Sequence, residues 1–313
     1  MNTVEHDLAR RLGRNYAVLI NNDAVLELLA FMCLSNSVFG SRTLTNQDEV
    51  VLAATASPQW IQICKSFSRP VLTDISIFTL SPTNLMWAEA LTENTKLIVL
   101  PNTLGYLQNQ DSIRELKEQN HLWVIEDLTH AVNSTVDGGL AGDNGDISIV
   151  SLGQDGGVLL TDSSMIYQVL NELVALFKLE ATEETLLGAR GWGATMDYRI
   201  SKCNQLWEYF WRENEDGFFL CPPVGMNMVA NHNNLVLLPI GGQLEGLAQF
   251  LISSGVEGVS TWGNGLPDYC DLVGFPKSAR VFSNSVIIDL EPQNYKSLDI
   301  INSLISQYKE QHG

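Results

Sequence analysis

Asp127 and His130 are the side chains best placed to do chemistry in this chain of 313 residues. They follow an apolar run, Leu122 to Ile125, that ends abruptly in Glu126 and Asp127. Such a run predicts a buried parallel strand, and open α/β sheets bind ligands beyond the carboxyl ends of their strands. A carboxylate beside an imidazole could orient a general base. The alternative is that both side chains only satisfy backbone groups at the strand end.

The first half of the chain predicts the sheet that positions these side chains. Strands are expected at residues 17–20, 50–54, 70–73, 96–100, 122–125, 147–151 and 157–161, with helices between most of them. This alternation favours a mostly parallel sheet with crossover helices. The link from Ser151 to Gly157 is too short for a crossover helix, so the last two strands are expected to be antiparallel.

The second half predicts a smaller domain. Residues 235–239, 243–253, 258–262, 286–290 and 295–311 are expected to form strand, helix, strand, strand and helix. Three glycines between Leu187 and Thr195 indicate a flexible connection, so we predict domains at 1–186 and 187–313. Trp207, Phe210 and Trp211 are expected to pack between domains or subunits.

Composition narrows the possible partners. Acidic residues outnumber basic ones by 36 to 18, giving a formal net charge of -18, which disfavours nucleic acid and anionic membranes. No apolar window is long enough to span a bilayer, and Met1 to Arg14 has no signal-type apolar core. Five dispersed cysteines fit reduced thiols. A cytoplasmic protein is therefore expected.

The segment from Leu122 to Thr161 resembles the DegT-type sugar aminotransferases, which are pyridoxal-phosphate (PLP) enzymes of fold type I. In that family a strand ends in an Asp that pairs with the cofactor's ring nitrogen, and a Gln or His follows three residues later. Those positions here are Asp127 and His130. The resemblance is collinear from Val4 to the last helix, without the family's N-terminal arm. It implies a seven-stranded mostly parallel sheet with flanking helices plus a small C-terminal α/β domain.

The resemblance also identifies a gap. The family has a strand ending in Ser-Phe, a loop with the Schiff-base lysine, and a Gly-Gly entry into the next strand. Here Ser151-Leu152 and Gly156-Gly157 remain, but only Gly153-Gln154-Asp155 lies between them. Some relatives carry His in place of this lysine and act as sugar dehydratases, yet this loop has no His either. Lys202 is the lysine nearest to another family site segment.

Two further positions disfavour the cofactor's phosphate. In the family, the turn after the first strand binds the phosphate through its amides, but here Asp23 places a carboxylate there. Asp197 stands where a family Asn reaches the neighbouring subunit's cofactor. The cofactor-binding candidates that the resemblance leaves are Asp127, His130, Ser151 and Trp60. Trp60 could stack on the cofactor ring, although a Trp on an apolar helical face is more often a core residue. No metal site is expected, because the His and Asp residues lack ligand spacing.

These features favour a degenerate family member without conventional PLP Schiff-base chemistry and with no resident cofactor. It would be a binding or partner protein in nucleotide-sugar or natural-product biosynthesis, as a homodimer or as a heterodimer with a related subunit, with a nucleotide-sugar as a candidate ligand. One alternative is an enzyme of altered, PLP-independent chemistry that uses Asp127 and His130. Another is an active PLP-dependent sugar aminotransferase with a displaced lysine.

Overall fold

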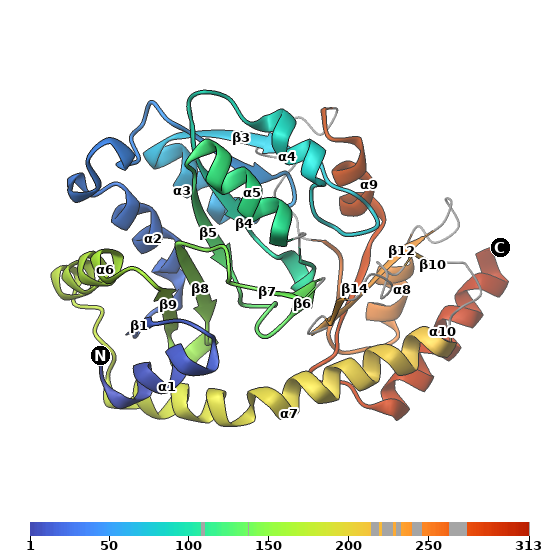
Figure 1. Ribbon diagram of the computed structural model, residues 1–313. Helices are drawn as coiled ribbons and strands as arrows, with labels where there is room; N and C mark the ends of the chain where they lie inside the picture. Colours follow the sequence, from blue (N-terminus) through green and yellow to red (C-terminus); the bar gives the residue numbers. More distant parts are fainter. Residues whose placement is uncertain are drawn as a thin grey trace.

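The computed structural model describes residues 1–107, 110–136, 138–213, 219–220, 228–229, 233–239, 246–262 and 274–312. Within these residues, a large sheet is flanked by helices, and a smaller sheet with its own helices follows toward the C-terminus (Figure 1). This confirms the predicted α/β architecture.

The large sheet has seven strands in the order β1-β9-β8-β5-β4-β2-β3. Their bounds are Tyr16–Ile20 (β1), Glu49–Ala53 (β2), Arg69–Thr73 (β3), Thr95–Leu100 (β4), Trp123–Asp127 (β5), Ile147–Ser151 (β8) and Gly157–Thr161 (β9). Strands β3, β2, β4, β5 and β8 pair in parallel, whereas β9 is antiparallel to both of its neighbours. The antiparallel pairing of β8 with β9 was expected, because the link between them holds only a 3-10 turn, Gly153–Asp155 (η4).

Helices cover both faces of this sheet. The side chains of α2 (Leu26–Leu34), α3 (Pro58–Phe67) and α6 (Ser164–Phe177) build the core on one face. The helices α1 (Thr3–Arg11), α4 (Asn84–Ala90), α5 (Gln110–Asn120) and the start of α7 (Glu183–Glu213) cover the other. Local signals set several helix starts: Ser57 caps α3 ahead of a proline, and Asn2 with Glu5 forms a capping box on α1.

The predicted flexible connection at Leu187–Thr195 is wrong. These residues lie inside α7, a helix of 31 residues that runs from the large sheet to the C-terminal sheet (Figure 1). Tertiary packing overrides the low helix propensity of glycine, since Ala189, Gly193 and Met196 are buried on this helix. The predicted boundary after residue 186 falls within the first turns of α7, and the division at 186 and 187 stays a prediction.

The C-terminal part is built on a four-stranded sheet in the order β10-β12-β14-β13. Its strands are Phe219–Leu220 (β10), Asn234–Pro239 (β12), Val259–Ser260 (β13) and Val286–Asp289 (β14), and its helices are Leu247–Ser253 (α8), Pro276–Asn284 (α9) and Tyr295–His312 (α10). A three-stranded sheet joins Met228–Val229 (β11) to the hairpin of Thr135–Val136 (β6) and Gly139–Leu140 (β7). Residues 243–245 of the predicted helix at 243–253 lie outside the described residues.

The aromatic run on α7 has a different role from the predicted one. Trp207 and Phe210 are 1% exposed and belong to the core of the C-terminal part, together with residues of α8 and α10. They therefore pack within one unit and not between units. A separate contact ties that part to the large sheet: Asp74, just after β3, accepts hydrogen bonds from the Lys277 and Ser278 amides at the start of α9.

Among the described residues, no helix combines the length and apolar character needed to cross a membrane. In the same part of the chain, no three His, Cys, Asp or Glu side chains gather in a way that could hold a metal ion. Cys33, Cys64 and Cys203 are buried free thiols, whereas Cys221 and Cys270 lie outside the described residues.

Candidate functional site

The carboxyl end of β5 carries two acidic side chains that point to opposite faces of the sheet. Successive side chains of a strand alternate between faces. Glu126 therefore meets residues near α5, whereas Asp127 meets α2 and α3 on the other face. Only Asp127 borders the open end of the sheet, since it is half-buried and Glu126 is fully buried.

Asp127 is fixed in place by hydrogen bonds to neighbouring residues. Its Oδ1 accepts the Thr129 amide at 2.9 Å, and its backbone carbonyl accepts the Asn102 amide group at 3.2 Å. Burial raises the pKa of the Asp127 carboxyl, while hydrogen bonds from Thr129, the charge of His130 and a hydrogen bond from Trp60 act in the opposite direction. Asp127 is thus a carboxyl group whose ionised form is disfavoured by its surroundings.

His130 lies close enough to Asp127 to influence its charge, but it is exposed and no hydrogen bond joins the two described side chains. The two predicted site residues are therefore brought together at one end of the sheet. The arrangement is looser than a hydrogen-bonded carboxylate–imidazole pair, because Thr129 occupies Oδ1 of the carboxylate.

Ser151, the third predicted residue, lies at the end of β8 beside this strand end. Its amide donates to Thr129 Oγ1 at 3.0 Å, which links the ends of β5 and β8. Its hydroxyl donates to Asp23 Oδ2 at 2.5 Å. The carboxylate expected at the turn after β1 therefore reaches across to β8 and takes the Ser151 hydroxyl.

Glu27, on the first turn of α2, completes a group of three carboxyl side chains. Burial raises its pKa to about 7, and the charges of Asp127 and Asp23 act in the same direction. Gln59 Nε2 donates to Glu27 Oε2 at 2.9 Å and opposes this shift. Asp23, Glu27 and Asp127 are each partly buried, so their charges are poorly screened by water.

Trp60 is a core residue in this fold. It is 1% exposed, and its ring packs at 6.1 Å from the ring of Phe31 on α2. Its face is therefore not open for stacking on a ligand, but its side chain hydrogen-bonds the Asp127 carboxyl. Asp197, by contrast, lies exposed on α7.

The short link between β8 and β9 fits tightly against its neighbours. Gly156 has a φ of +96°, and a Cβ there would lie 2.1 Å from the Ile20 carbonyl oxygen of β1. A Cβ on Gly188 of α7 would lie 2.2 Å from Asp155 Oδ1. Glycine at both positions lets η4 lie between the end of β1 and α7.

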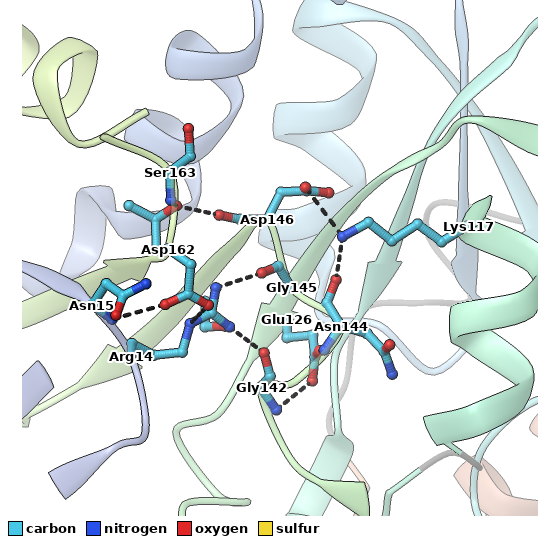
Figure 2. Close-up of polar contacts among 12 residues, drawn as sticks. Arg14, Asn15, Lys117, Glu126, Gly142, Asn144, Gly145, Asp146, Asp162 and Ser163 are labelled. Atoms are coloured by element: carbon cyan, nitrogen blue, oxygen red, sulfur yellow. Dashed lines mark hydrogen bonds and ion pairs between the residues drawn. The ribbon is translucent and has the colours of Figure 1, made fainter. Parts of the chain in front are cut away.

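The other acidic side chain of β5 belongs to a paired network (Figure 2). Glu126 is 0% exposed, and its carboxylate oxygens accept the amides of Gly142 at 2.9 Å and Asn144 at 3.0 Å. Burial raises the pKa of Glu126, while these amides, the Arg14 guanidinium and Asn102 lower it. The geometry suits an ionised carboxylate, because both oxygens act as acceptors.

Arg14 supplies the positive charge of this network from the segment before β1. Its guanidinium lies 3.0 Å from Asp162 and donates to the Gly145 carbonyl at 2.6 Å and to the Gly142 carbonyl. Lys117 of α5 adds an ion pair with Asp146 at 3.1 Å (Figure 2). Together these contacts fix the loop that leads from β7 into β8.

A small cavity of about 30 Å³ lies beside Thr129 and against α7. Its lining includes Trp192, Met196 and Arg199 of α7, and Arg199 also pairs with Glu291. The cavity has room for about one water molecule and not for a sugar.

Sequence reasoning missed Glu27, Thr129 and the Arg14–Glu126 network. Glu27 stands in an apolar helix, and an acidic residue there was a usable signal of a buried carboxyl group. Thr129 carried no signal of its own, because its role depends on the register of β5 against β8. Arg14 and Glu126 are far apart in sequence and meet only through the sheet order.

Comparison with known proteins identifies the family to which this sequence is similar. The model of the DegT/DnrJ/EryC1/StrS aminotransferase family matches residues 1–196. A dTDP-4-dehydro-2,6-dideoxy-D-glucose 3-dehydratase from Saccharopolyspora spinosa is 32% identical over 177 residues, which cover 54% of this chain and 38% of the dehydratase. The chain spans less than half the length of the curated relatives it matches.

Solved structures share the whole fold. The aminotransferase TlmJ from Streptoalloteichus hindustanus superposes with a TM-score of 0.85 and 19% identity, covering 98% of this chain and 90% of that chain. The Escherichia coli GDP-4-keto-6-deoxy-D-mannose-3-dehydratase with bound hydrated PLP gives a TM-score of 0.83 and 19% identity, covering 96% and 90%. At these identities the likeness concerns the fold.

Proposed function

This chain belongs to the DegT/DnrJ/EryC1/StrS aminotransferase family, and we propose that it is a degenerate member without conventional PLP Schiff-base chemistry. We infer that it acts as a binding or partner protein in nucleotide-sugar or natural-product biosynthesis. Its relatives include sugar 3-dehydratases and a sugar transaminase, which supports this pathway class.

One observation carries the proposal. The β8–β9 link, where the family carries its lysine, is the single 3-10 turn Gly153–Asp155 with neither lysine nor histidine. A Schiff-base enzyme needs an amine that holds the cofactor and shuttles the proton. This short link packs closely on its neighbours, because a Cβ on Gly156 would meet the Ile20 carbonyl oxygen and a Cβ on Gly188 would meet Asp155.

The positions of the lysines support the same conclusion. Lys96 pairs with Asp48 at the start of β4, and Lys117 pairs with Asp146 before β8. Lys202 donates to the Glu291 carbonyl at 2.9 Å in the C-terminal part. The others lie on or beside helices: Lys65, Lys178, Lys277, Lys296 and Lys309.

A second candidate is an enzyme of altered, PLP-independent chemistry. It is favoured by the neighbouring positions of Asp127 and His130 and by the raised pKa of the Asp127 carboxyl, which suits a proton-transfer group. In this reading Asp127 and His130 would act as the acid–base residues. Loss of an assayed activity in His130→Ala, with an unchanged unfolding curve, would distinguish this enzyme from a binding protein.

A third candidate is an active PLP enzyme with a displaced lysine. Lys178 merits the first test, because the carbonyl of the next residue, Leu179, accepts the Asn21 amide at the end of β1. Lys202 is engaged in the C-terminal part instead.

We propose a homodimer or a heterodimer with a related, active subunit, a nucleotide-sugar as the ligand class, and a cytoplasmic location. The surface charge supports the absence of nucleic-acid and membrane partners, since a formal charge of -18 repels both.

The deciding experiment is a PLP titration of the purified protein, followed by borohydride reduction and peptide mass mapping. We expect no shifted absorbance band and no pyridoxyl-lysine. A reduced adduct on Lys178 or another lysine would overturn the proposal and identify the replacement residue. Lys178→Ala, compared with Lys309→Ala on α10, would then show whether the adduct is specific.

A further inference from the structure

We propose that Asp23 excludes phosphate-bearing ligands from the group formed by Asp23, Asp127 and Ser151, because its carboxylate stands at the strand-to-helix turn and takes the Ser151 hydroxyl as a donor. This inference rests on the proposed function and deepens it, since it names the class of ligand that this site rejects and the residue that rejects it.

The position of Asp23 is one where α/β proteins bind anions. It follows β1 at the end of the sheet that also carries Asp127 and Ser151, directly before helix α2. Backbone amides at such a strand-to-helix turn normally attract phosphate. Here the Asp23 carboxylate itself stands at the turn and accepts the Ser151 hydroxyl at 2.5 Å.

Several other donors of the turn are also hydrogen-bonded within the chain. The Asn21 amide donates to the Leu179 carbonyl at 3.1 Å, and the Ala24 amide donates to the Asn22 side chain at 3.1 Å. The Leu26 amide donates to the Asp23 carbonyl. The Glu27 backbone amide hydrogen-bonds the side-chain carboxyl group of the same residue.

Two backbone amides near Ser151 are likewise hydrogen-bonded within the chain. The Gly153 amide donates to Ser151 Oγ at 3.0 Å, and the Ser151 amide donates to Thr129 Oγ1 at 3.0 Å. The only hydroxyl proton of Ser151 is therefore used in the hydrogen bond to Asp23. A phosphate in this position would have to displace an acceptor that is covalently part of the site.

Charge adds to this competition. Glu27 and Asp127 interact electrostatically with each other, and Asp23 interacts with Glu27. A phosphate group at this turn would meet the carboxyl groups of Asp23, Glu27 and Asp127, and like charges at contact distance repel strongly where water is scarce. The residues present therefore do not fit the phosphate of PLP.

The test compares ligands that differ only in the phosphate. Pyridoxamine 5′-phosphate and pyridoxamine, neither of which forms Schiff bases with lysines, are titrated calorimetrically into the full-length protein and into Asp23→Asn. The substitution keeps the size of the side chain and removes its charge. We expect wild type to bind both ligands equally weakly, and Asp23→Asn to bind pyridoxamine 5′-phosphate about tenfold more tightly, without a gain for pyridoxamine.

Glu310→Gln on α10 is the matched control, because it makes the same change in net charge on an exposed helix away from the cleft. It should leave both affinities unchanged. The inference is overturned if Asp23→Asn gains less than threefold for the phosphate ligand, if it gains equally for both ligands, or if wild type already binds pyridoxamine 5′-phosphate tightly. None of these results restores a Schiff-base lysine, so the proposed function is tested separately by the borohydride experiment.

Discussion

Glu126 and Asp127 are neighbours in one strand, yet their surroundings differ in every respect that matters for a buried charge. Glu126 is fully enclosed and meets two backbone amides and the Arg14 guanidinium. Asp127 is half-buried and meets one amide, two side-chain donors, the exposed His130 and the like charge of Glu27. The negative charge of Glu126 is balanced by an opposite charge and by hydrogen bonds, whereas the charge of Asp127 is not.

Two acidic residues of one strand can therefore have different roles: Glu126 stabilises the structure, whereas Asp127 belongs to the candidate site. A buried charge is tolerated when an opposite charge and hydrogen bonds surround it. The Arg14 network satisfies that condition and positions the loop before β8. The carboxyl groups around Asp127 satisfy it incompletely, which is a property that titratable groups of functional sites often share. The comparison can be tested by substitutions on each side.

The largest effect is expected from Glu126→Gln compared with Asp127→Asn. Both substitutions remove one carboxylate from β5 and keep the side-chain size. Glu126→Gln should lower the free energy of unfolding by about 3 kcal/mol, because it leaves Arg14 buried beside a neutral group and points an amide NH₂ toward a backbone N–H. Asp127→Asn should change it by less than about 0.5 kcal/mol, since its Oδ1 still accepts from Thr129.

Urea unfolding at pH 7 measures both variants. Equal losses of stability would show that Asp127 is as structural as Glu126 and would remove the basis of the comparison. Circular dichroism of the folded baseline serves as the control, because a variant that has lost its fold at zero urea reports on neither side chain.

An intermediate, pH-dependent effect is expected from Glu27→Gln in the acidic group. The folded-state pKa of Glu27 is about 7, above its ordinary value of 4.5. Between these values the folded protein binds more protons than the unfolded chain, so the free energy of unfolding of wild type falls as the pH rises through this window. Glu27→Gln removes that loss, and we expect it to be about 1–2 kcal/mol more stable than wild type at pH 8 and similar at pH 4.5.

Thermal or urea unfolding across pH 4.5 to 8 checks this sign. Glu310→Gln, at an exposed position of α10, provides the reference for a simple change in net charge. A stability difference that grows toward acidic pH would mean that Glu27 is ionised and stabilised in the folded state, contrary to its position beside Asp23 and Asp127.

The smallest effect concerns the contact between the shortened link and α7. Gly188→Ala would bring a Cβ to 2.2 Å from Asp155 Oδ1, so it should lower the free energy of unfolding by about 1 kcal/mol. Gly191→Ala, on the same helix, meets nothing within 4 Å and should raise it by about 0.5–1 kcal/mol through helix propensity. Opposite signs in urea unfolding would confirm that η4 is packed on α7, and equal gains would show that it is not.

Much of the fold was predictable because its signals are local. The runs at Lys96 to Leu100 and Leu122 to Ile125 predicted central strands, and the short link after Ser151 predicted an antiparallel last pair. The glycines of α7 misled the prediction, since a local propensity cannot show that Gly188 permits the approach of Asp155. Likewise, Trp207 gave no sign of whether it packs within one unit or between two.

By itself, the sequence determined the α/β class, the order of strands and helices in the first half of the chain, and the absence of a lysine between Ser151 and Gly157. These are properties of residue type and spacing. Only the tertiary structure decided that Asp23 reaches Ser151, that Glu27 faces Asp127, and that Glu126 meets Arg14. Those contacts join residues distant in sequence. The first two depend on the sheet order, which brings the carboxyl ends of β1, β5 and β8 together, whereas the third forms around the loop that leads into β8.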